Sequence, residues 1–193
     1  MRVFAALTPP TDVLEDLEDF LSPRRDDSAA RALGWTRPAD WHLTLAFMGS
    51  ARPDAVDGFV DRLADGTLDL PAPTVRIRGG GAFPVVERAR VLYAAVPDGT
   101  GDLARLSERT RAAAAVSGCS PDGRAFVPHL TLARSRRPIE ATRWVRVLDT
   151  YAGPPWTPTH VAVVESHLGQ GRPRYAVLAE VPIGPDLPSG PTS

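Results

Sequence analysis

Residues 128–134 of this chain are Pro-His-Leu-Thr-Leu-Ala-Arg, and residues 41–47 are Trp-His-Leu-Thr-Leu-Ala-Phe. The pentapeptide His-Leu-Thr-Leu-Ala therefore occurs twice. Its alternation of leucine with a β-branched residue predicts a strand for each copy. Because side chains alternate between the faces of a strand, the histidine and threonine of each copy are expected on one face and the leucines on the other.

Similar elements are predicted around the two copies. Hydrophobic periodicity and turn residues predict the elements of the first half as a strand at 2–7, a helix at 12–21 capped by Thr11, the first His-x-Thr strand ending at Met48, a helix beginning near Pro53, and a strand at 71–78 broken by the glycines at 79–81. The same signals predict those of the second half as a strand at 90–96, a helix at 103–117, the second His-x-Thr strand at 124–134, a helix at 141–148, and strands at 159–168 and 175–181.

The two halves thus share the order strand, helix, His-x-Thr strand, helix, strand. Phe4 precedes His42 by 38 positions, and Tyr93 precedes His129 by 36. This parallel predicts an α+β fold that is bilobal, with duplicated antiparallel sheets, flanking helices and pseudo-twofold symmetry. The two His-x-Thr strands would face a central cleft. We expect one bilobal domain over residues 1–181, made of two intertwined lobes, and a flexible Pro/Gly/Ser-rich tail at 182–193.

Composition excludes several classes of function. The chain has 193 residues and a formal net charge of -1, so no global basic field attracts long duplex nucleic acid. Cys119 is its one cysteine, which excludes an intramolecular disulfide and a cysteine-rich metal site. All 22 basic residues are arginine, so no nucleotidyl-lysine, Schiff-base lysine or phosphate-loop lysine exists. No apolar stretch is long enough to span a membrane, and we expect a cytoplasmic, monomeric protein.

The repeated residues suit acid–base chemistry on a phosphodiester. Histidine, with an ordinary pKa of ~6.5, is the usual general acid and base near neutral pH. A pair of histidines can divide these roles, while the hydroxyls of Thr44 and Thr131 donate hydrogen bonds to non-bridging phosphate oxygens. One histidine would activate water and the other would protonate the leaving oxygen. Each copy supplies one histidine without an adjacent carboxylate or thiol, so we expect neither a metal nor a cofactor.

The sequence resembles the two-histidine (2H) phosphoesterase superfamily, and within it the bacterial RNA 2′,3′-cyclic phosphodiesterases, also called 2′-5′ RNA ligases. The resemblance covers nearly the whole chain. The stretches that carry it are Arg2-Val3-Phe4-Ala5-Ala6, residues 41–49 around the first His-x-Thr, Gly81-Ala82-Phe83-Pro84, Arg90-Val91-Leu92-Tyr93, residues 126–134 around the second, Glu165-Ser166 and Tyr175.

This resemblance implies metal-independent opening of a 2′,3′-cyclic phosphate, on RNA ends or nucleotides, to a 2′-phosphate. It implies that His42 donates a proton to the leaving 3′ oxygen and that His129 accepts one from water. Thr44 and Thr131 would hold the phosphate. The residues alone leave the order of the two histidines open, because the motifs are nearly identical. The reverse reaction, 2′-5′ ligation, would need no ATP.

Two residues that follow the motifs have two interpretations each. Family position makes Arg134 a substrate-binding residue, whereas strict alternation puts it on the face opposite His129 unless a β-bulge re-aims it. Phe47 could stack on a base, but its parity favours the core. The glycines at 79–81 could admit a ligand close to the backbone, but a plain turn is favoured.

Two other functions remain open at this point. One is a non-catalytic module that binds RNA ends or nucleotides and uses the histidines for contact alone. The other is a cyclic phosphodiesterase that acts on a small molecule such as ADP-ribose cyclic phosphate. The near-neutral net charge favours small or end-directed substrates over long duplex RNA.

Overall fold

The computed structural model describes residues 1–25, 30–167 and 174–184, and within these it is an α+β protein, as expected. The helices of this part are α1 (Thr11–Leu21), α2 (Pro53–Thr67), α3 (Asp102–Val116) and α4 (Thr142–Leu148). The strands are β1 (Val3–Leu7), β2 (Gly34–Trp35), β3 (Leu43–Met48), β4 (Val75–Arg78), β5 (Gly80–Phe83), β6 (Ala89–Ala95), β7 (His129–Ile139), β8 (Ala152–Trp156), β9 (His160–His167) and β10 (Arg174–Pro182).

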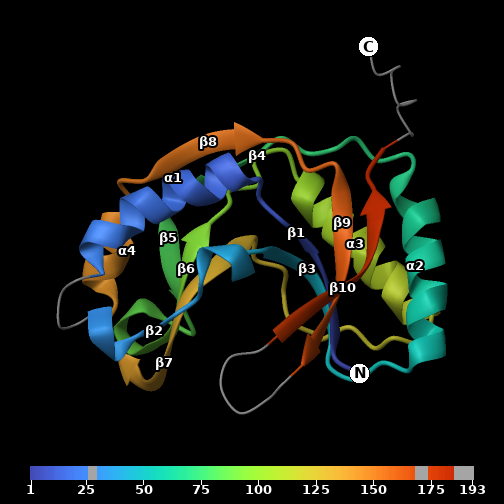
Figure 1. Cartoon of the computed structure of the whole chain (residues 1–193), viewed down its shortest axis with the longest axis horizontal. Coiled ribbons are helices and arrows are strands. Elements are labelled where there is room, and N and C mark those ends of the chain that lie inside the picture. The colour runs from blue at the N-terminus through green and yellow to red at the C-terminus, as the bar shows by residue number, and fades with distance from the viewer. Residues whose placement is uncertain (26–29, 168–173, 185–193) are drawn as a thin grey trace.

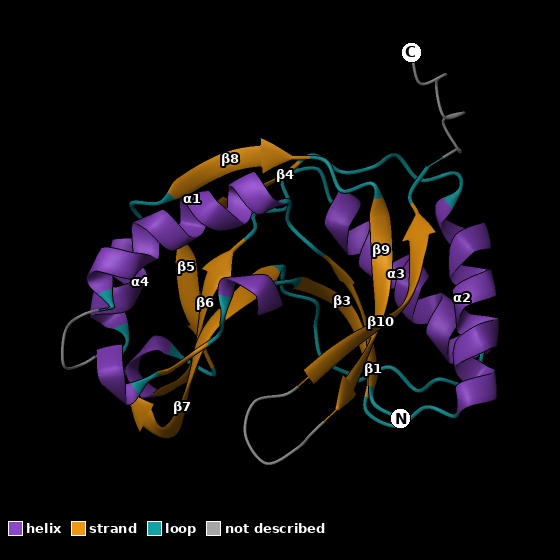
Figure 2. Cartoon of the chain, in the orientation of Figure 1, coloured by secondary structure: helices purple, strands orange, loops and turns teal. Residues whose placement is uncertain are grey.

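The main sheet has the strand order β10-β9-β1-β3-β7-β6-β5, and β2 pairs beside it with β7. All of its pairs are antiparallel, and β3 meets β7 at the single pair Leu43 and Leu130. The two His-x-Thr segments are therefore neighbours at the middle of one sheet. Figures 1 and 2 show α2 and α3 beside β1, β3, β9 and β10, and α1 and α4 beside β5, β6 and β7.

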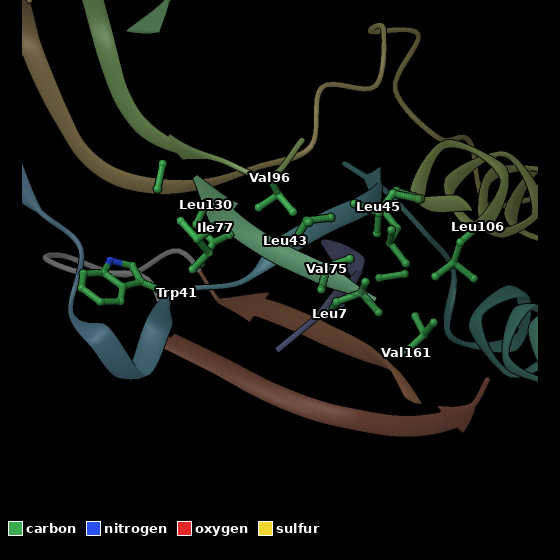
Figure 3. Packing of buried hydrophobic residues seen from close by; sticks show 14 of the residues in the cluster. Leu7, Trp41, Leu43, Leu45, Val75, Ile77, Val96, Leu106, Leu130 and Val161 are labelled. Atoms are coloured by element: carbon green, nitrogen blue, oxygen red, sulfur yellow. The ribbon is translucent and has the colours of Figure 1, made fainter. Parts of the chain in front are cut away.

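The main core lies on one face of this sheet. Val3, Ala5 and Leu7 of β1 belong to it, whereas Phe4 and Ala6 belong to a smaller cluster on the other face. The leucines of the two repeats join the main core, and Figure 3 shows Leu43, Leu45 and Leu130 within it. The predicted alternation is thus realised: leucines anchor each repeat, and the opposite face is left for polar groups.

The helices form largely where periodicity predicts them. Pro53 occupies the first turn of α2, where its missing N–H costs no hydrogen bond. Thr11 lies inside α1 and makes no capping hydrogen bond, so its predicted role as cap is wrong; Pro10 precedes the helix instead. In the described part of the chain no helix is both long and apolar enough to cross a membrane.

Three strand predictions need correction. β7 begins at His129 and runs to Ile139, so residues 124–128 precede the strand. The predicted break of the strand occurs at Gly79, which has a φ of 73°, but Gly80 and Gly81 belong to β5, which pairs with β6. β8, with its two prolines, was not predicted and pairs with β4 in a separate two-stranded sheet. Prolines are tolerated in such edge strands because one side of the strand needs no donor.

The first residues of the predicted tail, 182–184, belong to the folded part of the protein. β10 continues through Pro182, and the backbone N–H groups of Ile183 and Gly184 donate to the carbonyls of Thr159 and Thr67. Residues 185–193, which make up the rest of the predicted tail, lie outside the described residues.

Candidate active site

The two repeats place their polar side chains at the junction of β3 and β7. His42 directly precedes β3 and His129 is the first residue of β7, while Thr44 and Thr131 lie within these strands. All four side chains are half-buried. Neither threonine hydroxyl has a hydrogen-bond partner among the described residues, so both are available to a ligand.

Both imidazole rings are held in the same way. The Nδ1 atom of His42 lies 2.8 Å from the carbonyl oxygen of Asp40, and that of His129 lies 2.6 Å from the carbonyl oxygen of Val127. A carbonyl oxygen only accepts, so Nδ1 carries the proton in each ring and Nε2 is the nitrogen left for chemistry.

The Nε2 atoms of both rings lack a partner within the described part of the chain and are open to solvent. The buried side-chain nitrogens without a partner there are those of Arg2, Arg25, Trp41 and Trp156.

Aromatic rings pack against each histidine. Phe4 stacks on His42 with ring centroids 4.6 Å apart, and Tyr175 meets the same ring edge-on at 5.6 Å. On the other side of the junction, the rings of Phe83 and Tyr93 lie 5.0 Å and 5.1 Å from that of His129. These contacts fix the orientation of the imidazoles and remove water from their faces.

A β-bulge in β7 brings Arg134 to the histidine face. Residues directly opposite each other in an antiparallel pair share a face, and β6 pairs Ala95 with His129, Tyr93 with Thr131 and Val91 with Arg134. The three partners on β6 are two residues apart each time. On β7 the step from Thr131 to Arg134 is three residues, so Leu132 is one extra residue. Strict alternation fails at this bulge, so Arg134 lies on the same face of β7 as His129 and Thr131.

A matching bulge in β3 corrects the prediction for Phe47. β1 pairs Phe4 with Phe47 and Ala6 with Thr44, and the extra residue is Leu45. Phe47 therefore shares the face of Thr44 and packs on the smaller cluster around Phe4 rather than in the main core. The guanidinium of Arg2 lies 5.2 Å from the centre of its ring.

Burial and charge set the protonation of the two rings. Burial, which disfavours the charged form, lowers the pKa of His42, and the nearby charges of His129 and Arg134 lower it further, against the opposing effect of Asp40. Burial also lowers the pKa of His129, and Arg134 adds to this effect. The guanidinium of Arg134 is therefore close enough to act on both rings.

Comparison with known proteins gives the family. The family model described as 2′-5′ RNA ligase superfamily matches residues 12–170. The chain belongs to the 2′-5′ RNA ligase superfamily. An RNA 2′,3′-cyclic phosphodiesterase of Thermus thermophilus is 33% identical over 195 residues, which cover 92% of this chain and 88% of that protein. One of Aeropyrum pernix is 30% identical over 146 residues, 74% of this chain and 81% of the relative.

Solved structures share the superfamily fold. A crystal structure of a Thermus thermophilus protein has a TM-score of 0.78 at 24% identity and covers 97% of this chain and 100% of its own. Escherichia coli LigT complexed with 3′-AMP has a TM-score of 0.72 at 25% identity, covering 94% and 97%. The α+β fold with mostly antiparallel sheets is thus common to these proteins and this superfamily member.

Sequence reasoning missed the rings around the histidines of this superfamily member. The parallel spacing of Phe4 to His42 and of Tyr93 to His129 was the available signal, but it indicated a duplication and not a contact. The other histidines lie elsewhere: His160 is 3.2 Å from Glu180, and His167 is 3.3 Å from Glu165. The described residues contain no cluster of three or more His, Cys, Asp or Glu side chains that could hold a metal ion.

The lowered pKa of both histidines can be tested directly. We expect NMR titration of the imidazole resonances to place the pKa of His42 and that of His129 below the ordinary ~6.5. Arg134→Gln should raise both values, because it removes a positive charge that opposes protonation. Arg62→Gln, which removes an exposed guanidinium of α2, should move neither.

The lowered pKa values of the two histidines also make the stability of the folded protein depend on pH. Unfolding restores the ordinary pKa, so the stability these rings contribute is present above about pH 6.5 and is lost as the pH falls through their lowered pKa values. A pKa of either histidine above ~6.5, or one unchanged by Arg134→Gln, would contradict this account of the site.

Proposed function

We propose that this protein hydrolyses 2′,3′-cyclic phosphate at the end of RNA or of a nucleotide to a 2′-phosphomonoester, without a metal or cofactor. The observation that carries the proposal is the pair of half-buried histidines, each holding its Nδ1 proton on a backbone carbonyl and each presenting Nε2. The names of the relatives support the choice of substrate.

The reaction needs two proton transfers, and the site offers a nitrogen for each. Nε2 of His129 accepts a proton from water as the water oxygen bonds to phosphorus. The bond from phosphorus to the 3′ oxygen breaks, and Nε2 of His42 donates its proton to that oxygen. The product is a 2′-phosphate with a free 3′ hydroxyl. Exchange of protons with solvent then returns both rings to their starting forms.

Mutual repulsion favours one protonated ring and one neutral ring, which the two proton transfers require. The charge of His129 lowers the pKa of His42. Without a ligand, a pair with one protonated ring is therefore favoured over a pair with two. A bound phosphate would add negative charge and favour protonation of a ring beside it. Positive charge on Arg134 and hydrogen bonds from Thr44 and Thr131 would stabilise the oxygens on which charge grows.

We further propose that residues 1–181 act as one bilobal domain with the phosphate in a cleft between the lobes. The sheet supports this division, because β9-β1-β3 on one side and β5-β6-β7 on the other meet at the single pair Leu43 and Leu130, and β10 extends the first side beyond β9. The order of these three strands on one side mirrors that on the other, which is the arrangement a pseudo-twofold axis between β3 and β7 would produce.

The test is turnover of an oligoribonucleotide that ends in a 2′,3′-cyclic phosphate, with EDTA present, followed by assignment of the phosphate position. A 2′-phosphate product is the expected result. Binding of the RNA end without turnover would replace the proposal by the non-catalytic module. Turnover of ADP-ribose cyclic phosphate in preference to any RNA end would assign the small-molecule substrate.

A further inference from the structure

Positive charge is concentrated where β7 leaves the histidine site. Residues 134–146 contain five arginines and one glutamate, a net charge of +4, although the whole chain has a net charge of -1. Such a local excess creates a field that attracts anions even when the protein as a whole is nearly neutral.

The irregular pairing of β6 with β7 leaves Arg136 and Arg137 directed outward. Val91 lies opposite Arg134 and Ala89 opposite Ile139, so the four residues 135–138 of β7 face one residue of β6. The side chains of Arg136 and Arg137 are exposed there.

Two arginines from the β6 side lie beside them. The Nη1 atom of Arg90 donates to the carbonyl oxygen of Arg136 at 3.0 Å, and Arg88, also exposed, ends the short 3-10 turn before β6. We call Arg88, Arg90, Arg136 and Arg137 the arginine end of β7.

Among the described residues, no carboxylate forms an ion pair with the arginine end of β7, although Glu87 precedes Arg88 in the chain. Several exposed arginines elsewhere are paired with aspartate: Arg37, Arg52, Arg105 and Arg124. None of the four arginines of the arginine end forms such a pair. Glu140, the one acidic residue of 134–146, accepts hydrogen bonds from the N–H and hydroxyl of Thr142 at the start of α4.

The arginine end follows the histidine site along β7. His129, Thr131 and Arg134 follow one another along β7 on one face, and Arg136 and Arg137 come next. Arg134 and Ile139 pair with β6 residues that are two apart, about 7 Å along the strand, so Arg136 and Arg137 bulge outward within that length. Stacked nucleotides rise about 3.4 Å each along one strand, so this length corresponds to about two nucleotides.

We propose that the arginine end of β7 binds the backbone phosphates of an RNA chain whose cyclic phosphate occupies the histidine site. This inference rests on the proposed function and makes its substrate class an oligoribonucleotide rather than a mononucleotide. A 2′,3′-cyclic phosphate is at the 3′ end of its chain, so every other phosphate lies on the 5′ side. The arginines therefore contact nucleotides upstream of the reacting end.

The test compares two substrates and two matched variants. The substrates are adenosine 2′,3′-cyclic monophosphate and a hexaribonucleotide that ends in a 2′,3′-cyclic phosphate. Arg136→Ala with Arg137→Ala removes two charges from the arginine end. Arg52→Ala with Arg105→Ala removes one charge just before α2 and one from α3, and these helices lie on the other side of the molecule (Figure 1). We expect the first variant to lower kcat/KM for the hexamer about tenfold and to leave that for the mononucleotide unchanged.

Salt dependence and direct binding complete the experiment. Each lost phosphate contact should reduce the slope of log affinity against log salt by about 0.7 for a single strand. Fluorescence anisotropy with a labelled hexamer bearing a 2′-phosphate measures this without turnover, so it tests the arginine end even if the proposed reaction fails. Equal hexamer affinity and salt slope in the two double variants would overturn the inference, and turnover of the hexamer with no effect of either variant would leave the proposed function standing.

Discussion

Replacing either His42 or His129 by alanine is expected to lower kcat for a cyclic phosphate end by about 10²–10⁴-fold, the range for one positioned acid or base. Each ring supplies a different proton transfer to the same displacement, so neither can take over the role of the other. Removing both should cost less than the product of the single losses, because groups that act in one step are not additive. Single-turnover rates with the hexaribonucleotide would measure these effects.

The chain provides its own controls for this experiment. His160→Ala and His167→Ala remove imidazoles that lie beside glutamates, and both variants should keep full activity. His42 is packed between Phe4 and Tyr175, so His42→Asn would accompany the alanine variant to keep a polar side chain there. Circular dichroism of each variant separates lost chemistry from lost fold. Activity that survives both His42→Ala and His129→Ala would remove the histidines from the mechanism.

The second large effect concerns the fold around the site. Gly80→Val is expected to lower the free energy of unfolding by about 3 kcal/mol, at the upper end of the usual cost of overpacking. A Cβ atom at this position would lie 2.5 Å from Cδ1 of Leu148, 2.7 Å from its Cβ and 2.8 Å from the carbonyl oxygen of Tyr93. The backbone oxygen cannot move without distorting β6, which supports His129 through Tyr93.

Thermal unfolding measures this change, because 3 kcal/mol corresponds to roughly 6–12 °C in a protein of this size. Gly66→Ala is the matched control: Gly66 lies within α2, and its Cβ would meet nothing within 4 Å. It should stabilise the protein by about 0.5–1 kcal/mol, because glycine is the more flexible residue in the unfolded chain. A melting temperature for Gly80→Val equal to that of the parent would show that β5 tolerates a side chain there.

Alternation within the repeats was sufficient to predict which face holds the histidines and which holds the leucines. It failed beyond the threonines, because each strand contains one extra residue. Leu45-Ala46 and Leu132-Ala133 are consecutive apolar residues that are all buried, and such a doublet inside an alternating strand is the visible trace of a bulge. The same doublet in both stretches brings Phe47 and Arg134 to the face of the threonines, because the two stretches have the same sequence from the histidine to the alanine.

The strand β5 shows a different limit of sequence reasoning. Consecutive glycines usually break a strand, and nothing local predicts that Gly80 and Gly81 continue one. Their reason lies far along the chain, where Leu148 and the ring of Tyr93 fill the space that side chains at these positions would need. Information of this kind exists only in the folded molecule.

The two bulges have a consequence for how a ligand can be oriented. From the histidine to the alanine after each bulge the two motifs have the same residues, and these residues alone would accept a phosphate either way round. The next residue is Phe47 in one half and Arg134 in the other, an aromatic ring against a fixed charge. We expect this difference to give the site a direction, since a base or sugar favours the ring and a phosphate favours the guanidinium. Two nearly identical motifs would then distinguish the two ends of a ligand.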